Sequence, residues 1–127
     1  MMAITTKTVA LKVLVVDDEP VLRFLIAEVL KDAGLTVVEA ATADEAIAQL
    51  RLDTCIRLVF SDIRMPGSMD GIGLARAIEA DFATVRVMLT SGNTPSHIEP
   101  GRPVIAKPYD LAAVSAQIVD ALARLAA

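Results

Sequence analysis

The sequence predicts an α/β fold in which helices cover both faces of one parallel sheet. Two features support this prediction: short runs of Val, Leu and Ile alternate with segments whose apolar residues recur at helical spacing, and five such runs occur in 127 residues. Hydrophobic residues make up 54% of the chain but aromatic residues only 3%, so the core has to be built from aliphatic side chains. The length is typical of a single domain.

The first strand and helix are predicted from the beginning of the chain. The unbroken apolar run at 11–16 is typical of a strand that is covered on both faces. Acidic residues occupy 17–19, where they suit the positive end of a helix dipole, and Pro20 suits the first turn of that helix. Apolar residues then recur at helical spacing as far as Gly34, which is placed to end the helix.

The remaining elements follow the same alternation. The second helix is predicted to open on Thr42, with Glu45 three residues later in a capping-box pattern. The third begins after Asp70 and the last after Asp110, which are residue types preferred at helix N-caps. We expect strands at 35–40, 58–61, 85–89 and 104–106, and helices at about 42–50, about 72–80 and from 111 onward.

One helix of this series is predicted to be shortened or missing. The segment SGNTPSHIEPGRP, before the last strand, contains three prolines and two glycines, which leaves room for about one helical turn. Pro103 suggests that the last strand lies at an edge, where a missing amide donor is tolerated. We therefore expect a flavodoxin-like (βα)5 doubly wound parallel sheet, strand order 2-1-3-4-5, with a shortened or missing fourth helix.

Reactive polar side chains stand just past four of the predicted strands. They are Asp17 and Asp18 after the first strand, Asp62 after the third, Thr90 and Ser91 after the fourth and Lys107 after the fifth. The carboxyl ends of parallel strands share one edge of the sheet, where ligands bind. Three carboxylates held together repel one another unless a cation joins them, and Mg²⁺ suits a site that also receives phosphoryl oxygens. Together with Lys107 and Thr90, this set predicts phosphoryl transfer with Asp62 as the nucleophile.

Each of these residues has a plainer interpretation when taken alone. The acids at 17–19 can simply begin a helix, and Asp62 can cap a turn. The convergence of four separate segments on one edge favours the site. Glu39 and Thr42 are left outside it, because the second strand is expected at the opposite edge, and His97 is not expected to bind a metal, since only Glu99 lies near it at ligand spacing.

Composition narrows the classes of partner. The formal net charge is −4 and no block of Lys or Arg occurs, which disfavours direct binding of nucleic acid. No apolar run is long enough to cross a membrane, no secretory signal is evident, and the single Cys55 cannot form an internal disulfide. We expect a cytoplasmic protein with a flexible tail at 1–9 and one domain at 10–127.

Four stretches, VLVVDDEP, FSDIRMPGSMDG, MLTSGN and AKPYD, occur in this order and together resemble the receiver domain of two-component response regulators. The resemblance extends from about Leu11 to the C-terminus. It implies that Asp62 accepts a phosphoryl group from a sensor histidine kinase or a histidine phosphotransfer protein. It also implies that Asp18, Asp62 and the backbone carbonyl of Arg64 bind Mg²⁺ directly, and that Asp17 assists through water.

The same resemblance assigns the remaining site residues and reveals three departures from the family pattern. Thr90 matches a hydroxyl that moves to the phosphoryl group, Lys107 matches the family's lysine, and the small Ser91 leaves the donor a path. Val104 occupies a position that often holds an aromatic switch residue, and Tyr109 is not expected to replace it. The fourth helix is nearly missing, and MPGSMDG is one residue longer than the commoner motif.

These features predict a single-domain receiver that signals through protein–protein contacts or passes its phosphoryl group along a phosphorelay, and that is not an enzyme. A receiver that forms part of a larger hybrid kinase or regulator would look identical. A phosphatase or phosphotransferase using an aspartyl-phosphate is a further alternative, but the Asp-x-Asp signature and cap insertion expected of a haloacid-dehalogenase-type enzyme are missing. A degenerate receiver would carry a damaged acceptor site. The sequence leaves open the downstream protein partner and whether the chain forms a homodimer.

Overall fold

A computed structural model describes residues 11–93, 95 and 98–126. The expected tail at 1–9 and His97 lie outside these described residues. The helices and strands are β1 (Lys12–Val16), α1 (Pro20–Asp32), β2 (Thr36–Ala40), α2 (Ala43–Leu52), β3 (Ile56–Asp62), α3 (Gly71–Asp81), β4 (Arg86–Ser91), β5 (Val104–Ala106) and α4 (Leu111–Ala126). The strands form one parallel sheet in the order β2-β1-β3-β4-β5, which confirms the predicted fold class and strand order.

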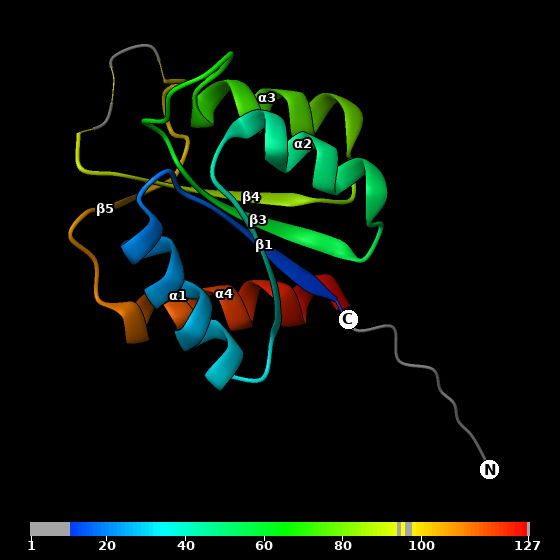
Figure 1. The fold of residues 1–127 in the computed structure, drawn as a ribbon, viewed down its shortest axis with the longest axis vertical. Helices are drawn as coiled ribbons and strands as arrows, with labels where there is room; N and C mark the ends of the chain where they lie inside the picture. The colour runs from blue at the N-terminus through cyan, green and yellow to red at the C-terminus, as the bar shows by residue number, and fades with distance from the viewer. Residues whose placement is uncertain (1–10, 94, 96–97, 127) are drawn as a thin grey trace.

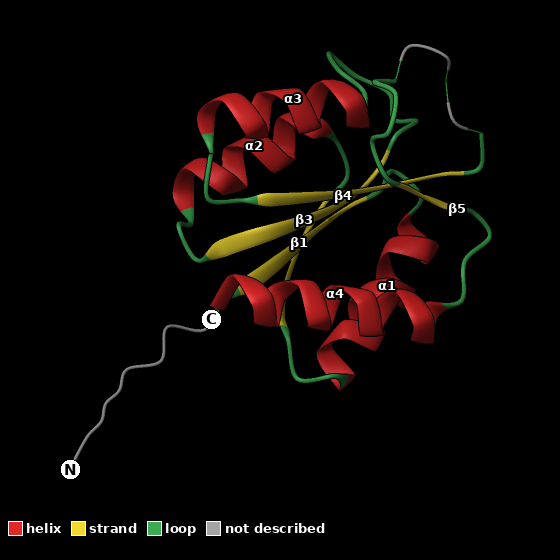
Figure 2. Ribbon diagram, turned by 180° about the vertical axis from the view of Figure 1, so that it is seen from behind, coloured by secondary structure: helices red, strands yellow, loops and turns green. Residues whose placement is uncertain are grey.

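The sheet separates two layers of helices (Figures 1 and 2). Helices α1 and α4 cover one face, and α2 and α3 cover the other. Successive residues of a strand point to opposite faces. In β1, Val13 and Val15 therefore pack in the core beneath α1 and α4, whereas Leu14 and Val16 pack in the core beneath α2 and α3. This burial on both faces explains why the central strands are unbroken apolar runs.

Two strands extend further than the apolar pattern predicted. β3 continues past Ser61 to Asp62, and β4 continues past Leu89 to Ser91. Asp62 pairs with Thr90 in the ladder, because the backbone can continue its hydrogen bonding after the apolar run has ended. The polar residues are thus held on rigid strand ends rather than in loops.

The connection between β4 and β5 contains no helix in its described residues, as predicted. An ion-pair network of Arg76, Glu79, Glu99 and Arg102 holds this connection against α3. Arg102 donates to both carboxylate oxygens of Glu79 at 2.8 Å, and its Nε donates to Glu99 at 2.7 Å. Arg76 Nε donates to the other oxygen of Glu99 at 2.6 Å. Ile98 packs against the small apolar cluster beneath α3.

Hydrogen bonds within the network shift the pKa values of its members. The bonds from Arg76 and Arg102, together with a backbone hydrogen bond, lower the pKa of Glu99 to about 2. The bonds with Glu79 and Glu99 raise the pKa of Arg102. Glu99 and Arg102 therefore remain charged across the physiological range.

The predicted helix caps are present in three helices. Thr42 Oγ1 accepts a hydrogen bond from the Glu45 N–H at 3.1 Å, although the Glu45 carboxylate reaches the N–H of Ala41 rather than that of Thr42. Asp70 accepts from the Gly73 N–H at 2.9 Å, and Asp110 caps α4 through the Ala112 N–H at 3.1 Å. Among the described helices, none is long and apolar enough to span a membrane.

Candidate functional site

The carboxyl ends of β1 and β3 bring the three predicted acids together. Asp17 directly follows β1, Asp18 comes next in the connection to α1, and Asp62 ends β3. One carboxylate oxygen from each acid lies within 4.8 Å of the other two. The solvent-exposed fractions of Asp17 and Asp62 are only 4% and 6%, whereas Asp18 is exposed to solvent. We call these three residues the acidic cluster.

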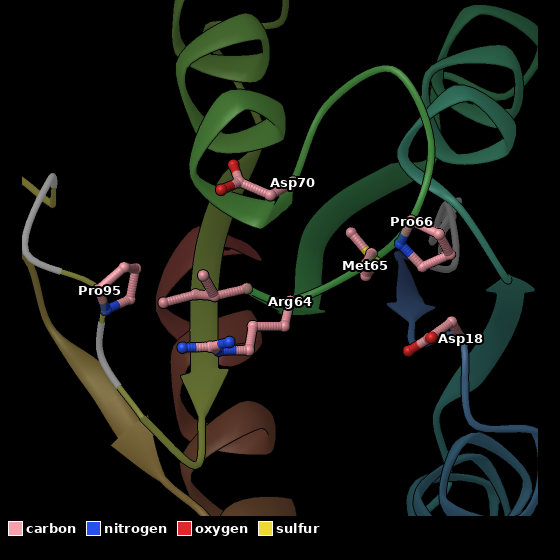
Figure 3. A pocket seen from close by; sticks show the side chains of 7 residues that line it. Asp18, Arg64, Met65, Pro66, Asp70 and Pro95 are labelled. Atoms are coloured by element: carbon pink, nitrogen blue, oxygen red, sulfur yellow. The ribbon is translucent and has the colours of Figure 1, made fainter.

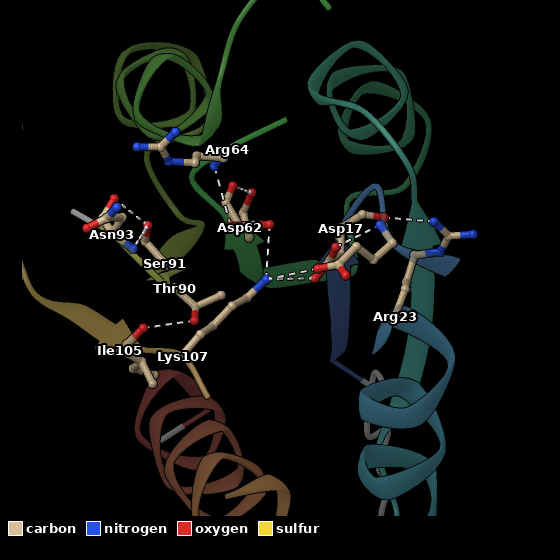
Figure 4. A network of polar contacts seen from close by, with 11 residues as sticks. Asp17, Arg23, Asp62, Arg64, Thr90, Ser91, Asn93, Ile105 and Lys107 are labelled. Carbon is tan, nitrogen blue, oxygen red and sulfur yellow. Dashed lines mark hydrogen bonds and ion pairs between the residues drawn. The ribbon is translucent and has the colours of Figure 1, made fainter. Parts of the chain in front are cut away.

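Lys107 reaches the acidic cluster from the end of β5 (Figure 4). Its Nζ donates a hydrogen bond to Asp62 Oδ2 at 3.0 Å and lies 3.6 Å from Asp17 Oδ2. The peptide bond between Lys107 and Pro108 is cis. Burial alone would lower the pKa of Lys107, but the hydrogen bond to Asp62 and the nearby carboxylate charges outweigh it and raise the pKa. The lysine is thus a counter-charge for the acids.

Asp17 is hydrogen-bonded through both its side chain and its main-chain carbonyl. Its Oδ1 accepts a hydrogen bond from the Glu19 N–H at 2.9 Å, and its main-chain carbonyl accepts from Arg23 at 2.7 Å. Burial raises the pKa of Asp17, although the hydrogen bond from Glu19 and the charge of Lys107 act in the opposite direction. Burial therefore makes the ionised form of Asp17 costly, and the hydrogen bond from Glu19 and the charge of Lys107 offset part of that cost.

Glu19 lies beside the acidic cluster, and its contact with Lys107 was not predicted from the sequence. It is the N-cap residue of α1, but its side chain makes no capping hydrogen bond. Its carboxylate instead lies 3.6 Å from Lys107 Nζ, with 65% of the side chain exposed. The acids before Pro20 thus contribute more to the charge around Lys107 than to capping of the helix.

Thr90 and Ser91 end β4 beside Asp62, and both of their hydroxyls are already bonded. Thr90 Oγ1 donates to the carbonyl of Ile105 in β5 at 2.8 Å. Ser91 Oγ donates to the carbonyl of Asn93 at 2.9 Å and accepts from its N–H at 3.1 Å. Thr90 has to exchange its bond with β5 before it can donate to a group carried by Asp62 (Figure 4).

An open pocket of about 510 Å³ adjoins the acidic cluster (Figure 3). It is lined by Asp18, Ile63, Arg64, Met65, Pro66, Asp70 and Pro95. The Arg64 N–H donates to Asp62 Oδ1 at 3.4 Å, which is a long hydrogen bond. The expected role of the Arg64 carbonyl as a metal ligand stays a prediction.

The longer MPGSMDG motif ties the rim of this pocket to α2. Ser68 Oγ donates to Asp44 Oδ1 in the first turn of α2 at 2.7 Å. Gly67 has a φ of 114°, which few residues other than glycine adopt. The additional residue therefore forms a turn that fastens the β3–α3 connection to a neighbouring helix.

A second glycine allows α3 to begin directly beside the end of β3. A Cβ at Gly71 would overlap the carbonyl of Asp62, and the Gly71 N–H donates to the carbonyl of Ile63 at 2.8 Å. This close approach positions the start of α3 against the backbone that carries the Asp62 carboxylate.

Val104 and Tyr109 lie on opposite sides of the sheet. Val104 is half-buried and packs with the cluster beneath α3, whereas Tyr109 packs with the core beneath α1 and α4. The Tyr109 ring meets Phe60 edge to face, with 5.8 Å between the ring centroids. Its hydroxyl is buried and has no hydrogen-bond partner among the described residues, and burial raises its pKa to about 12. Tyr109 is therefore not placed to replace an aromatic side chain at position 104.

The acidic cluster fits a small divalent cation. Mg²⁺ binds oxygen ligands at about 2.1 Å, so two ligands of one ion lie at most about 4.2 Å apart. The three carboxylates, with oxygens within 4.8 Å of one another, need to close by only a fraction of an ångström. Hard oxygen donors and the net negative charge that remains beside Lys107 are the properties that Mg²⁺ selects.

Arg23 is a second residue that sequence reasoning missed. Its Nη1 holds the Asp17 carbonyl, and its Nε donates to Glu39 Oε1 at 3.1 Å. Glu39 was correctly placed on a strand at the far edge, yet it contacts the site indirectly through this arginine. The available signal was that Arg23 follows the acids by about one helical turn.

The doubly wound sheet thus gathers three acids and a lysine at its carboxyl edge. The chain belongs to the response regulator receiver domain family, whose sequence profile matches residues 13–118. Members of this family accept phosphoryl groups from histidine kinases, bind Mg²⁺ at an acidic aspartate cluster and are in general switches rather than enzymes.

The similar proteins include regulators and isolated receiver domains. The C4-dicarboxylate transport transcriptional regulatory protein DctD of Rhizobium meliloti is 42% identical over 81 residues, which are 64% of this chain but 17% of DctD. The receiver domain from hybrid histidine kinase CckA is 32% identical with a TM-score of 0.72, covering 87% of this chain and 98% of that one. TrrA from Thermotoga maritima, solved in complex with Mg²⁺ and BeF, is 25% identical with a TM-score of 0.74, covering 87% of this chain and 97% of TrrA. The chain thus spans less than two thirds of the length of DctD.

Proposed function

We propose that this chain is a phosphorylation switch in which Asp62 accepts a phosphoryl group from a phosphohistidine in a Mg²⁺-dependent reaction. The observation that carries the proposal is the setting of Asp62. It ends a rigid strand beside an open pocket, with Lys107 Nζ at 3.0 Å and two further carboxylates within 4.8 Å. The Mg²⁺ complex of TrrA supports the same cation here.

The proposed reaction is an in-line displacement at phosphorus. A carboxylate oxygen of Asp62 attacks, the P–O bond forms as the P–N bond of the phosphohistidine breaks, and the leaving imidazole nitrogen keeps the electron pair. Asp17, Asp18 and Asp62 would hold Mg²⁺, which supplies positive charge for the phosphoryl oxygens. Lys107 moves its hydrogen bond from Asp62 to a phosphoryl oxygen, so its ammonium group is retained as a counter-charge throughout.

The proposed output begins at Thr90. When its hydroxyl turns to the phosphoryl group, the carbonyl of Ile105 loses its hydrogen bond from Thr90. β5 pairs with β4 through only three residues and lies at the edge of the sheet, so a lost contact there can shift it. Because Val104 lacks an aromatic ring, the shift has to be transmitted by the backbone of β5 and the ion-paired connection before it.

We infer that the phosphodonor docks on α1, whose Leu22 lines a pocket together with Lys107. Val21, Phe24 and Leu25 form an exposed apolar stripe, with 73%, 57% and 43% exposure. Beside it, an apolar pocket of about 410 Å³ opens between Leu22 and the start of α4. A helix of a histidine-containing donor protein fits such a stripe and groove. Phe24→Asp should therefore retain phosphorylation by a small donor and lose transfer from a phosphorylated histidine phosphotransfer protein.

Intact-mass measurement after incubation with Mg²⁺ and acetyl phosphate tests the proposal. Wild type should gain one phosphoryl group, and neither Asp62→Asn nor wild type in excess EDTA should do so. Asp120→Asn, a change of the same kind on α4, is the matched control and should be phosphorylated normally. If wild type gains no phosphoryl group, the proposal of a phosphorylation switch is wrong. If Asp62→Asn gains as much phosphoryl group as wild type, only the assignment of Asp62 as the acceptor is wrong.

A single-domain switch that acts through protein contacts is the simplest form of this proposal. The relative DctD is far longer than its matched segment, so the activity of a whole relative is not transferred to this chain. The proposal therefore concerns the phosphoacceptor and its immediate surroundings, whether the chain acts alone or passes the group along a relay.

A further inference from the structure

Arg23 makes two contacts that join three elements near the acidic cluster. From the second turn of α1, its Nη1 donates to the main-chain carbonyl of Asp17 at 2.7 Å, and its Nε donates to Glu39 Oε1 in β2 at 3.1 Å. Only 20% of its side chain is exposed. Figure 4 shows Arg23 and Lys107 on opposite sides of Asp17, so the arginine holds the backbone of Asp17 while the lysine faces its carboxylate.

The Asp17 carbonyl is the point at which the chain leaves the sheet. The Asp17 N–H still donates to the carbonyl of Ala40 at 3.1 Å, but β1 has ended at Val16. The carbonyl that Arg23 holds belongs to the peptide unit that joins Asp17 to Asp18. A peptide unit is planar, so fixing its oxygen also fixes the direction in which Asp18 leaves it.

Asp18 depends on this backbone for its orientation. Its side chain is exposed, and within the described part of the chain it makes no hydrogen bond or ion pair. Asp17 and Asp62, in contrast, are buried and hydrogen-bonded. Asp18 is therefore the one member of the acidic cluster whose side chain is not oriented by a contact with another described residue. The orientation of its peptide unit then decides how close its carboxylate comes to those of Asp17 and Asp62.

We propose that Arg23 is a positioning residue of the cation site, which orients the Asp17–Asp18 peptide so that the Asp18 carboxylate completes the acidic cluster. The proposal rests on the Mg²⁺ binding in the proposed function and adds a residue that does not touch the ion. The guanidinium is suited to the task because its planar fork can serve a carbonyl and a carboxylate at once.

The positive charge of Arg23 acts in the opposite direction to its positioning role. A cation near the cluster disfavours the binding of Mg²⁺, although the ion pair with Glu39 offsets part of this effect. Removal of the charge alone would therefore tighten Mg²⁺ binding, whereas loss of the positioning contacts would weaken it. The two effects have opposite signs, so a binding measurement separates them.

The test is isothermal titration calorimetry of the full chain with MgCl₂ at fixed ionic strength, with thermal unfolding in EDTA measured in parallel. Arg23→Lys keeps the charge but cannot form both contacts in one plane, and Arg23→Met removes the charge and the contacts. Arg57→Met is the matched control, since Arg57 Nε also donates to a main-chain carbonyl, that of Thr84, at 3.0 Å. Arg57 lies near the amino end of β3, away from the acidic cluster.

Both Arg23 variants should bind Mg²⁺ about tenfold more weakly than wild type, and Arg57→Met should bind it with unchanged affinity. Tighter binding by Arg23→Met would show that charge, not positioning, is the effect of Arg23. Unchanged affinity in both Arg23 variants, even with reduced stability in EDTA, would show a purely structural role and overturn the proposal. A wild type that binds no Mg²⁺ would overturn the proposed function and this inference together, whereas a failure confined to the variants overturns the inference alone.

Discussion

Replacement of Asp18 by Asn should make the protein more stable in the absence of divalent cations. Asp18 lies with Asp17 and Asp62 inside a cluster whose oxygens are within 4.8 Å of one another. Lys107 forms ion pairs with Asp17, Glu19 and Asp62, and its ion pairs do not include Asp18. Asp18→Asn therefore removes two repulsions without breaking an ion pair among the described residues.

The size of the effect follows from Coulomb's law. Two unit charges at this separation repel by about 0.9 kcal/mol in water and about 3.5 kcal/mol at an effective dielectric constant of 20. Asp18 is exposed, so the lower value applies to each of its two pairs, and the attraction of Lys107 offsets part of their sum. We expect a net gain of about 1 kcal/mol, which raises the midpoint of thermal unfolding by about 4 °C for a chain of this length.

Thermal and urea unfolding in EDTA at low ionic strength measure the gain, and Mg²⁺ should reverse the order. Mg²⁺ at ten times its dissociation constant should stabilise wild type by about 1.4 kcal/mol and should stabilise Asp18→Asn far less. Asp120→Asn, which changes the net charge equally but breaks an exposed pair with Arg124, should give no gain. If Asp18→Asn is no more stable than wild type in EDTA, repulsion within the acidic cluster is not a cost of this fold.

Three further predictions concern residues around the site. Tyr109→Phe removes a buried hydroxyl that has no partner among the described residues, so it should stabilise the chain by about 1 kcal/mol in urea unfolding, and a loss of stability would show that the hydroxyl is bonded. Arg102→Met should lower the thermal midpoint by several degrees, clearly more than Arg124→Met, because the Arg102 side chain is 17% exposed and that of Arg124 is 74% exposed. The pKa of Glu99 falls from 4.5 to about 2 on folding, so its contribution to stability is present above pH 4.5 and is lost as the pH falls toward 2. Acid unfolding monitored by circular dichroism should therefore depend less steeply on pH in Glu99→Gln, and an identical profile would refute the assignment.

The sequence predicted the sheet and the meeting of the site residues because both depend on local patterns. Apolar runs mark strands that are buried on both faces, and a parallel sheet necessarily gathers the residues at the carboxyl ends of its strands. Asp17, Asp62 and Lys107 were therefore placed together although they are far apart in the chain. The bounds of β3 were less predictable, because ladder pairing continues past the apolar run to Asp62.

The contacts between charged side chains were not predictable from the pattern. Arg102 and Glu79 are 23 positions apart, and each looks like an ordinary solvated charge in the sequence. The same is true of Arg23, whose partners are a main-chain carbonyl and a carboxylate on another strand. The direction of the Thr90 hydroxyl also depends on β5, which the sequence places near it without fixing its orientation.

The connection between β4 and β5, where a helix was predicted to be shortened or missing, is held by the ion-pair network. This makes one wall of the pocket sensitive to salt. A helix in this position would be held by internal hydrogen bonds and apolar burial, which salt scarcely weakens. Pro95 lines the pocket from the same connection that carries Glu99 and Arg102. At an ionic strength of 1 M, where the Debye length is about 3 Å, attraction between the partly exposed charges is weakened while the sheet retains its apolar core. The entrance to the phosphoacceptor should therefore loosen at salt concentrations that leave the rest of the domain folded.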